Sequence, residues 1–509
     1  MNRLVLAFGL VCLLQGLSAE PRPEFGVSLT LDATDRITAM KVETVSLKDS
    51  VTDLSPITAP TSGYAKLATT KTQLEAVISA FDTKISAITT AYDGLLSAND
   101  GNTDAAFTPL ITAIDDAITF ITTNAPAVKT ALDDISYTGI SDQLIDALTR
   151  IAAGFTDLKA KTQAVKTGLD AGLTAAGSNA ALTATLLRQY LPLRTMYDLL
   201  RSLTNLRYYL PLVKYILDTA IENIATADAY INSLTASLGS DVTAEAANYV
   251  TELEEITDDI VASVASDFDA DAAAAMVAAM SVSSLTEITS AANYGQLMAA
   301  VFNMMDLFTA ASLASQTGAM TAAFANIGTT LNSFIQGVRD ATTVTDEALV
   351  ILLIDTLMGN DEYGRYCYNK YKDLVKGLYN QGFDGGWECV DKEYQRLEHL
   401  METLEFISDL FVFDYEDFVS QVGVCNSLTI ASDVSDCVGA LQPFYTQLVT
   451  ATTAKIAALY TLATDEAAAS ENRLLICFQL VTLDTALVQT AAIQANLEIC
   501  AAQGPNGSD

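Results

Sequence analysis

The sequence predicts an all-α protein of long amphipathic helices, arranged as an antiparallel bundle or an extended helical array, with a C-terminal disulfide-stapled helical domain. Three observations predict this class. Apolar residues recur at alternating three- and four-residue steps. Proline and glycine are sparse, at 10 and 26 of 509 residues. All six cysteines beyond residue 19 lie in the last third of the chain. We therefore expect three regions, 1–19, 20–345 and 346–509.

The first region has the pattern of an export signal. Arg3 precedes an apolar run at residues 4–14, and small residues follow at 16–19. The run is shorter than the ~20 apolar residues that a membrane-spanning helix needs. We expect cleavage near Ser18 or Ala19, which removes Cys12, and a soluble, secreted mature chain without a transmembrane segment.

The charge of the chain excludes some partners. A net charge of −35 and a pI near 4.1 oppose binding to the phosphates of nucleic acids and to anionic membranes. No lysine or arginine occurs between Tyr215 and Val338. Salt bridges within this span therefore cannot stabilise it. This absence of basic residues has two alternative explanations. One is compositional drift, and the other is selection for resistance to trypsin-like proteases.

The second region is predicted to be helical because apolar seams run through it. The seams cover 67–95, 140–169, 210–238, 249–260 and 320–338. Each helix would bury only one stripe, so the helices must pack on one another.

Turn-type residues separate the predicted helices. The clusters stand at 56–60, 99–102, 124–126, 177–179 and 239–241. Two similar Tyr-Leu-Pro-Leu motifs place Pro192 and Pro211 at helix starts or kinks.

In the third region, a turn at residues 383–386 is expected to separate two helices. Cys367 and Cys389 would then begin consecutive helices, and Cys477 and Cys500 would bracket the last one. An even cysteine set behind an export signal indicates disulfides, and sequence alone leaves their pairing open. The predicted disulfide cysteines are Cys367, Cys389, Cys425, Cys437, Cys477 and Cys500.

This cysteine spacing, across a helical C-terminal region behind a signal peptide, resembles the TsetseEP domain family of secreted insect proteins. The resemblance covers residues 361–500. It implies an insect extracellular or midgut-lumen protein in a family whose molecular activity is not established. Glu20-Pro21 is an isolated pair, so no role of the founding protein's Glu-Pro repeats is transferred.

The sequence offers few catalytic candidates. His399 is the only histidine, which excludes multi-histidine metal sites and leaves a single residue for Ser/His or Cys/His catalysis. Acid pairs such as Glu254/Asp258 and Glu255/Asp259 lack a second partner, so we interpret them as a solvated acidic face. We expect no catalytic residue, no cofactor and no dedicated metal site.

Two further motifs are weak. Residues 267–271 imitate the start of a calcium loop, but Ala272 and Ala278 replace the required glycine and glutamate. Weak calcium binding by the acidic surface stays open. Asn506, in an Asn-Gly-Ser sequon, is a candidate glycosylation site.

A methionine-bearing segment allows an alternative function. Its methionines either pack in the core between helices or line a groove for an apolar ligand. We favour packing in the core. They are Met276, Met280, Met298, Met304, Met305 and Met320.

Three functions of different classes follow. The leading one is a secreted, acidic, non-catalytic structural or interaction protein of the gut lumen or extracellular matrix, with a protein, a glycan or itself as partner. The alternative is a carrier of lipid or another apolar ligand within a helical bundle. The third is a hydrolase that depends on His399.

Overall fold

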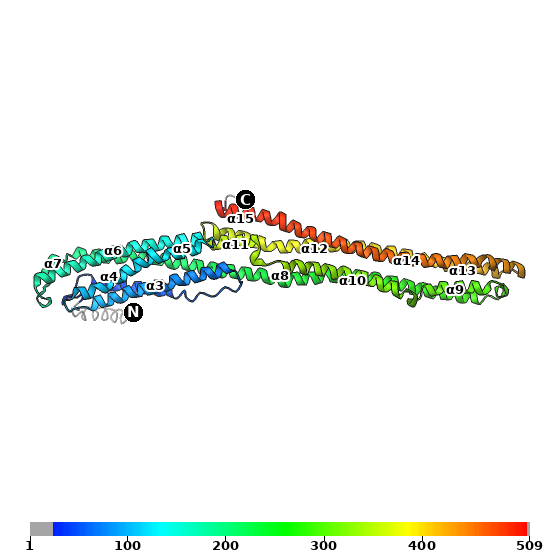
Figure 1. The fold of residues 1–509 in the computed structure, drawn as a ribbon, viewed down its shortest axis with the longest axis horizontal. Helices are drawn as coiled ribbons and strands as arrows, with labels where there is room; N and C mark the ends of the chain where they lie inside the picture. Colours follow the sequence, from blue (N-terminus) through cyan, green and yellow to red (C-terminus); the bar gives the residue numbers. More distant parts are fainter. Residues whose placement is uncertain (1–23, 506–509) are drawn as a thin grey trace, which may run out of the picture. The chain divides into compact units, whose positions relative to one another are not determined.

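The computed structural model describes residues 24–505, apart from the side chain of Tyr379, and it is an all-α protein (Figure 1). Of the described residues, 88% are helical. Within the described residues no strand is present, and the only bridge pairs Glu24 with Val27. The predicted fold class is confirmed. The predicted signal peptide at 1–19 lies outside the described residues.

The chain divides into two compact units. Unit 1 comprises Met1–Ser233, Ala348–Lys372 and Ala495–Asp509, and unit 2 comprises Leu234–Glu347 and Asp373–Gln494. Each unit takes residues from both sides of residue 345. This grouping follows contacts, whereas the predicted boundary followed cysteine content.

Unit 1 is a set of packed helices in which α3 lies between α2 and α4, and α6 packs on α4, α5, α7 and α11 (Figure 1). Its helices are α2 (Thr34–Thr52), α3 (Ala65–Ser97), α4 (Thr103–Thr119), η1 (Phe120–Asn124), α5 (Ala125–Asp133), α6 (Thr138–Ala176), η2 (Asn179–Ala181), α7 (Ala184–Tyr190), the first part of α8 (Leu193–Ser283), α11 (Ala348–Gly359), the start of α12 (Gly364–Asp409) and the end of α15 (Thr490–Gln503).

Two aspartates organise polar contacts in unit 1. Asp355, which interrupts the apolar helix α11, accepts hydrogen bonds from Lys66, Tyr64 and Tyr137. Asp228 accepts hydrogen bonds from the backbone N–H groups of residues 61 and 62, at 2.8 Å each. The Pro-rich loop between α2 and α3 is thus fixed to α8 by a side chain that satisfies its backbone donors.

Unit 2 is built around α14, which packs on α9, α10 and α13. Its aromatic centre stacks Phe268 on Tyr460, with ring centroids 5.7 Å apart, and places Phe308 and Phe411 beside them. Its helices are the remainder of α8, η3 (Glu287–Ser290), α9 (Tyr294–Leu307), α10 (Ala310–Ala341), η4 (Val344–Asp346), most of α12, α13 (Phe411–Asn426), α14 (Ala431–Leu483), η5 (Asp484–Gln489) and the start of α15.

The predicted turn at 383–386 is wrong, because α12 is continuous through it. A Cβ on Gly385 would lie 2.8 Å from Val481 Cγ1, and one on Gly386 would lie 2.6 Å from Tyr249 Oη. Tyr249 Oη also donates to the carbonyl of Phe383 at 2.9 Å. The glycines therefore permit close helix packing. As a result, Cys367 and Cys389 lie on the same helix and do not begin consecutive ones.

Two other predicted turns are also helical. Residues 239–241 lie inside α8, where the buried positions Leu234, Val242 and Ala246 continue the seam. This packing outweighs the ~1 kcal/mol that one exposed glycine costs a helix. Residues 124–126 pass from the π-helix η1 directly into α5, where Pro126 stands at a first-turn position that needs no N–H donor.

The two proline motifs have different outcomes. Pro192 directly precedes α8 and marks a helix start, whereas Pro211 lies inside α8. The clusters at 56–60, 99–102 and 177–179 do separate helices, as predicted.

The close packing at Gly386 predicts the effect of a substitution. We expect Gly386→Ala to lower the free energy of unfolding of unit 2 by ~1–3 kcal/mol, because its methyl group would collide with the buried Tyr249. Gly377→Ala, on the same helix with no atom within 4 Å of the added methyl, should raise it by ~0.5–1 kcal/mol. Urea unfolding followed by circular dichroism would measure both. Equal effects of the two substitutions would contradict this explanation.

Candidate functional site

All six predicted disulfide cysteines are paired, and the structure assigns their partners. Cys367 on α12 joins Cys500 on α15 within unit 1. In unit 2, Cys389 on α12 joins Cys477 on α14, and Cys425 on α13 joins Cys437 on α14. The Cα–Cα distances are 5.6–5.9 Å, which suits unstrained bridges. Three intramolecular disulfides are typical of extracellular proteins. Asn506 lies outside the described residues.

A buried ion pair stands one helical turn from the Cys389–Cys477 disulfide. Glu393 on α12 is 1% exposed and accepts hydrogen bonds from Nη2 and Nε of Arg473 on α14, at 2.5 and 3.1 Å. Arg473 also donates to Glu466, and Arg396 donates to Glu393. Hydrogen bonds from Arg473 to Glu393 raise the pKa of the guanidinium. The pair therefore joins α12 to α14 through several hydrogen bonds.

Sequence reasoning missed this pair. Glu393 follows Cys389 by one turn, and Arg473 precedes Cys477 by one turn. Opposite charges at matching distances from two cysteines are a signal that could have predicted both the disulfide and the antiparallel register of the two helices.

The calcium-like segment at residues 267–271 lies within the continuous helix α8. Asp269 is exposed, whereas Asp271 is 4% exposed and Phe268 is in the core. Asp267 and Asp271 lie one turn apart on one face of the helix and Asp269 lies on another face, so the three side chains do not form a loop around an ion. Among residues 24–505, no group of three or more Cys, His, Asp or Glu side chains is arranged to hold a metal.

Asp271 is the most perturbed carboxyl group of this segment. Tyr415 donates to its Oδ1 at 3.0 Å, while its Oδ2 and the buried hydroxyl of Ser408 have no hydrogen-bond partner. Burial raises the pKa of Asp271 to about 6 and outweighs the opposing effect of the hydrogen bond from Tyr415, and the nearby charge of Asp267 raises this pKa further. Burial, together with Glu405, raises the pKa of Asp267 as well. The cluster can hold a proton near neutral pH.

The other catalytic candidates lie at the surface. The side chain of His399 is 77% exposed, and its Nδ1 lies 3.3 Å from Glu402. The acid pairs Glu254/Asp258 and Glu255/Asp259 are exposed on α8. The structure brings none of them together with a second predicted catalytic group.

The predicted methionines do not line one groove. Met298, Met304 and Met320 are buried, whereas Met276 and Met280 are more than half exposed.

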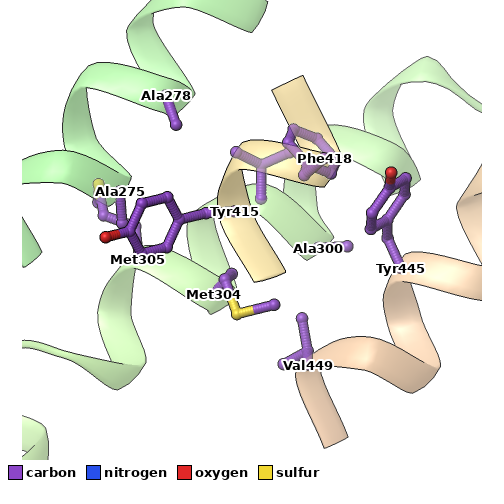
Figure 2. A pocket seen from close by; sticks show the side chains of 10 residues that line it. Ala275, Ala278, Ala300, Met304, Met305, Tyr415, Phe418, Tyr445 and Val449 are labelled. Carbon is purple, nitrogen blue, oxygen red and sulfur yellow. The ribbon is translucent and has the colours of Figure 1, made fainter. Parts of the chain in front are cut away.

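Figure 2 shows a pocket that Met304 and Met305 of α9 line together with Tyr415 of α13 and Tyr445 of α14. Its volume is about 10 Å³, which is the space of at most one water molecule. The methionines of this pocket fill a core and leave no room for a lipid.

Unit 1 carries an open groove between α3 and α4. Its volume is about 1150 Å³, and small side chains, including Ala87, Ala91 and Ala105, line it beside Asp104 and Asp116. The groove is shallow and has no buried polar group that would fix a ligand.

By length and composition, three helical stretches could cross a membrane. They are Thr103–Asp133, Tyr294–Ala341 and Ala431–Gln503. In the third, only 11% of the most apolar window is buried.

The comparisons with known proteins give no identity. No family model matches the chain, and no curated protein matches it.

The disulfides predict two different losses of stability. Cys389→Ala/Cys477→Ala opens a loop of 88 residues and should lower the free energy of unfolding by about 4–5 kcal/mol. Cys425→Ala/Cys437→Ala opens a loop of 12 residues and should cost about 3 kcal/mol, because a shorter loop restricts the unfolded chain less. Both bridges lie in unit 2, so one urea titration compares them. A larger loss for the short loop would contradict the entropic explanation.

Asp271 predicts a pH dependence. Its pKa in the folded state, about 6, lies above the ordinary value of 3.8, so the folded state binds this proton more tightly. The stabilising contribution is complete below pH ~4 and is lost as the pH rises through 6. At pH 7.5, Asp271→Asn should raise the free energy of unfolding by on the order of 2–3 kcal/mol, since a neutral amide can still accept from Tyr415 and can donate to Ser408. Stability would be measured from pH 4 to 8.

The exposed neighbour provides the control. Asp269→Asn removes the same charge from α8 without touching the buried cluster. If it reproduces the effect of Asp271→Asn, net charge and not burial is responsible.

Proposed function

We propose that the chain is a secreted, non-catalytic structural or interaction protein of an extracellular space such as the gut lumen or the extracellular matrix. The observation that carries the proposal is the set of three disulfides, two of which join α14 to neighbouring helices of unit 2. Such bridges persist in oxidising compartments. The insect and gut assignments rest on the resemblance of the cysteine spacing.

The charged groups between helices support a structural role. Arg473 donates to the buried Glu393, and Asp355 accepts hydrogen bonds from Lys66 and two tyrosines. In both places these polar groups connect one helix to another. The single histidine is exposed, with Glu402 as its neighbour.

A function as carrier of lipid or another apolar ligand has less support. The pocket at Met304 and Met305 has a volume of about 10 Å³, whereas sites for small ligands have volumes of ~300–1,000 Å³. The structural role is therefore the better interpretation of the methionine segment.

Export can be tested in insect cells. When the full-length chain is expressed, the protein recovered from the medium should lack its N-terminal signal residues. It should also have no free thiols, because all six remaining cysteines are paired. Retention in the cytosol with reduced cysteines would contradict the proposal. Mass spectrometry after thiol alkylation measures both properties.

Resistance to digestion gives a second test. Trypsin should leave a fragment bounded by Lys214 and Arg339, because no lysine or arginine lies between them. Native chymotrypsin should also spare most of this fragment, since aromatic residues such as Tyr249, Phe268 and Phe324 are 2% exposed. Chymotrypsin in urea should destroy it. Rapid loss of the fragment from native protein would show that the fold does not protect it.

A further inference from the structure

The last part of α14 has two apolar faces, and only one of them is covered. Leu474 and Phe478 face the core of unit 2 and are 2% and 7% exposed. The opposite face presents an outer stripe of large apolar side chains that are more than half exposed. The outer stripe consists of Ile476 (57%), Leu480 (60%), Leu483 (52%) and Leu487 (63%).

The form of the outer stripe indicates a helical partner. Its members follow steps of four, three and four residues, which is the spacing of a helix–helix seam. The exposed polar residues Gln479 and Asp484 stand beside the stripe, and the exposed Val488 (62%) adjoins its C-terminal end in η5. A helix that lies in a lipid interface has a row of basic residues on its polar face, and residues 474–494 contain no lysine or arginine. A second helix with a matching seam fits the stripe better than a lipid surface.

The charge of this segment points to a second copy of the same chain. Between Leu474 and Gln494 the only charged residue is Asp484, although the whole chain carries a net charge of −35. A cationic partner would find no row of carboxylates to pair with here. Two copies of the outer stripe can approach with little repulsion. A patch that contacts its own equivalent satisfies the requirement of a two-fold dimer.

We infer that the protein forms a homodimer through the outer stripe of α14 and η5, with each copy covering the stripe of the other.

A second exposed apolar patch of unit 2 is less suitable. Phe406 and Phe413 are 66% and 63% exposed. They stand close in sequence to Glu405, Asp409 and Asp414. Two copies that met at this patch would bring like charges together, which opposes association.

The length of the outer stripe limits the strength of the dimer. The stripe spans twelve residues, 476–487, which correspond to ~18 Å of helix. Toward the N-terminus, the stripe ends at Arg473, whose guanidinium is engaged by Glu393 and Glu466. A contact of this length is at the lower end of specific interfaces. We therefore expect an equilibrium that shifts to monomer on dilution.

This inference deepens the proposed structural role, on which its biological meaning rests. Its test is separate: a strictly monomeric protein would refute the dimer and would leave export and the non-catalytic role unaffected.

Sedimentation velocity of the secreted full chain over a dilution series tests the dimer. The wild type should shift from dimer to monomer as the concentration falls. Leu480→Glu/Leu483→Glu should weaken association by at least ~100-fold, because it places like charges opposite one another in the seam. Ile476→Gln/Leu487→Gln provides a second, uncharged disruption. Circular dichroism must show unchanged helix content in both variants.

The matched control is Phe406→Glu/Phe413→Glu, which adds the same charge to the competing patch and should dimerise like the wild type. Three results would overturn the inference: a wild type that is monomeric at every concentration, stripe variants that associate as well as the wild type, or dissociation caused by the control alone. Flotation with phosphatidylcholine vesicles completes the test. Binding of monomeric wild type to vesicles, lost in the stripe variants, would identify a lipid-binding face and exclude the dimer.

Discussion

The whole structure depends on apolar contact between amphipathic helices. With 62 acidic against 27 basic residues, charges repel one another on average and cannot supply the net attraction. In unit 2 the contact between α10 and α14, and the aromatic stack around Phe268, bury the side chains that hold the unit together. Among the polar groups in this interior, Glu393 is paired with Arg473, the hydroxyls of Ser408 and Ser470 have no hydrogen-bond partner, and burial favours the protonated carboxyl of Asp271.

Unit 2 combines two kinds of link between α12 and α14. The Cys389–Cys477 disulfide restricts the unfolded chain, and the Glu393–Arg473 pair lies one turn away on the same two helices. A buried ion pair adds little net stability relative to apolar residues, but breaking it is costly. Since only one alignment of the helices pairs these charges, the ion pair selects the register that also brings the two sulfur atoms together.

The sequence was sufficient to predict the helical class, the seams and the use of the cysteines, because these depend on local periodicity and on composition. It failed at Gly385 and Gly386, where turn-type residues serve close packing against Val481 and Tyr249. Whether a glycine ends a helix or allows a neighbouring helix to pack closely depends on residues that are far away in the sequence. The same holds for the cysteine pairing and for Asp271, whose burial depends on α13.

The gap in basic residues has a chemical consequence for the molecule. From Tyr215 to Asn369 the chain contains no lysine, so no side-chain amine is present anywhere on α9, α10 or α11. Isopeptide cross-linking and N-acylation of side chains require such an amine. Any covalent network that incorporates this protein through lysine must attach to the N-terminal helices or to α12 and α14, and it would leave the long acidic stretch between them unmodified.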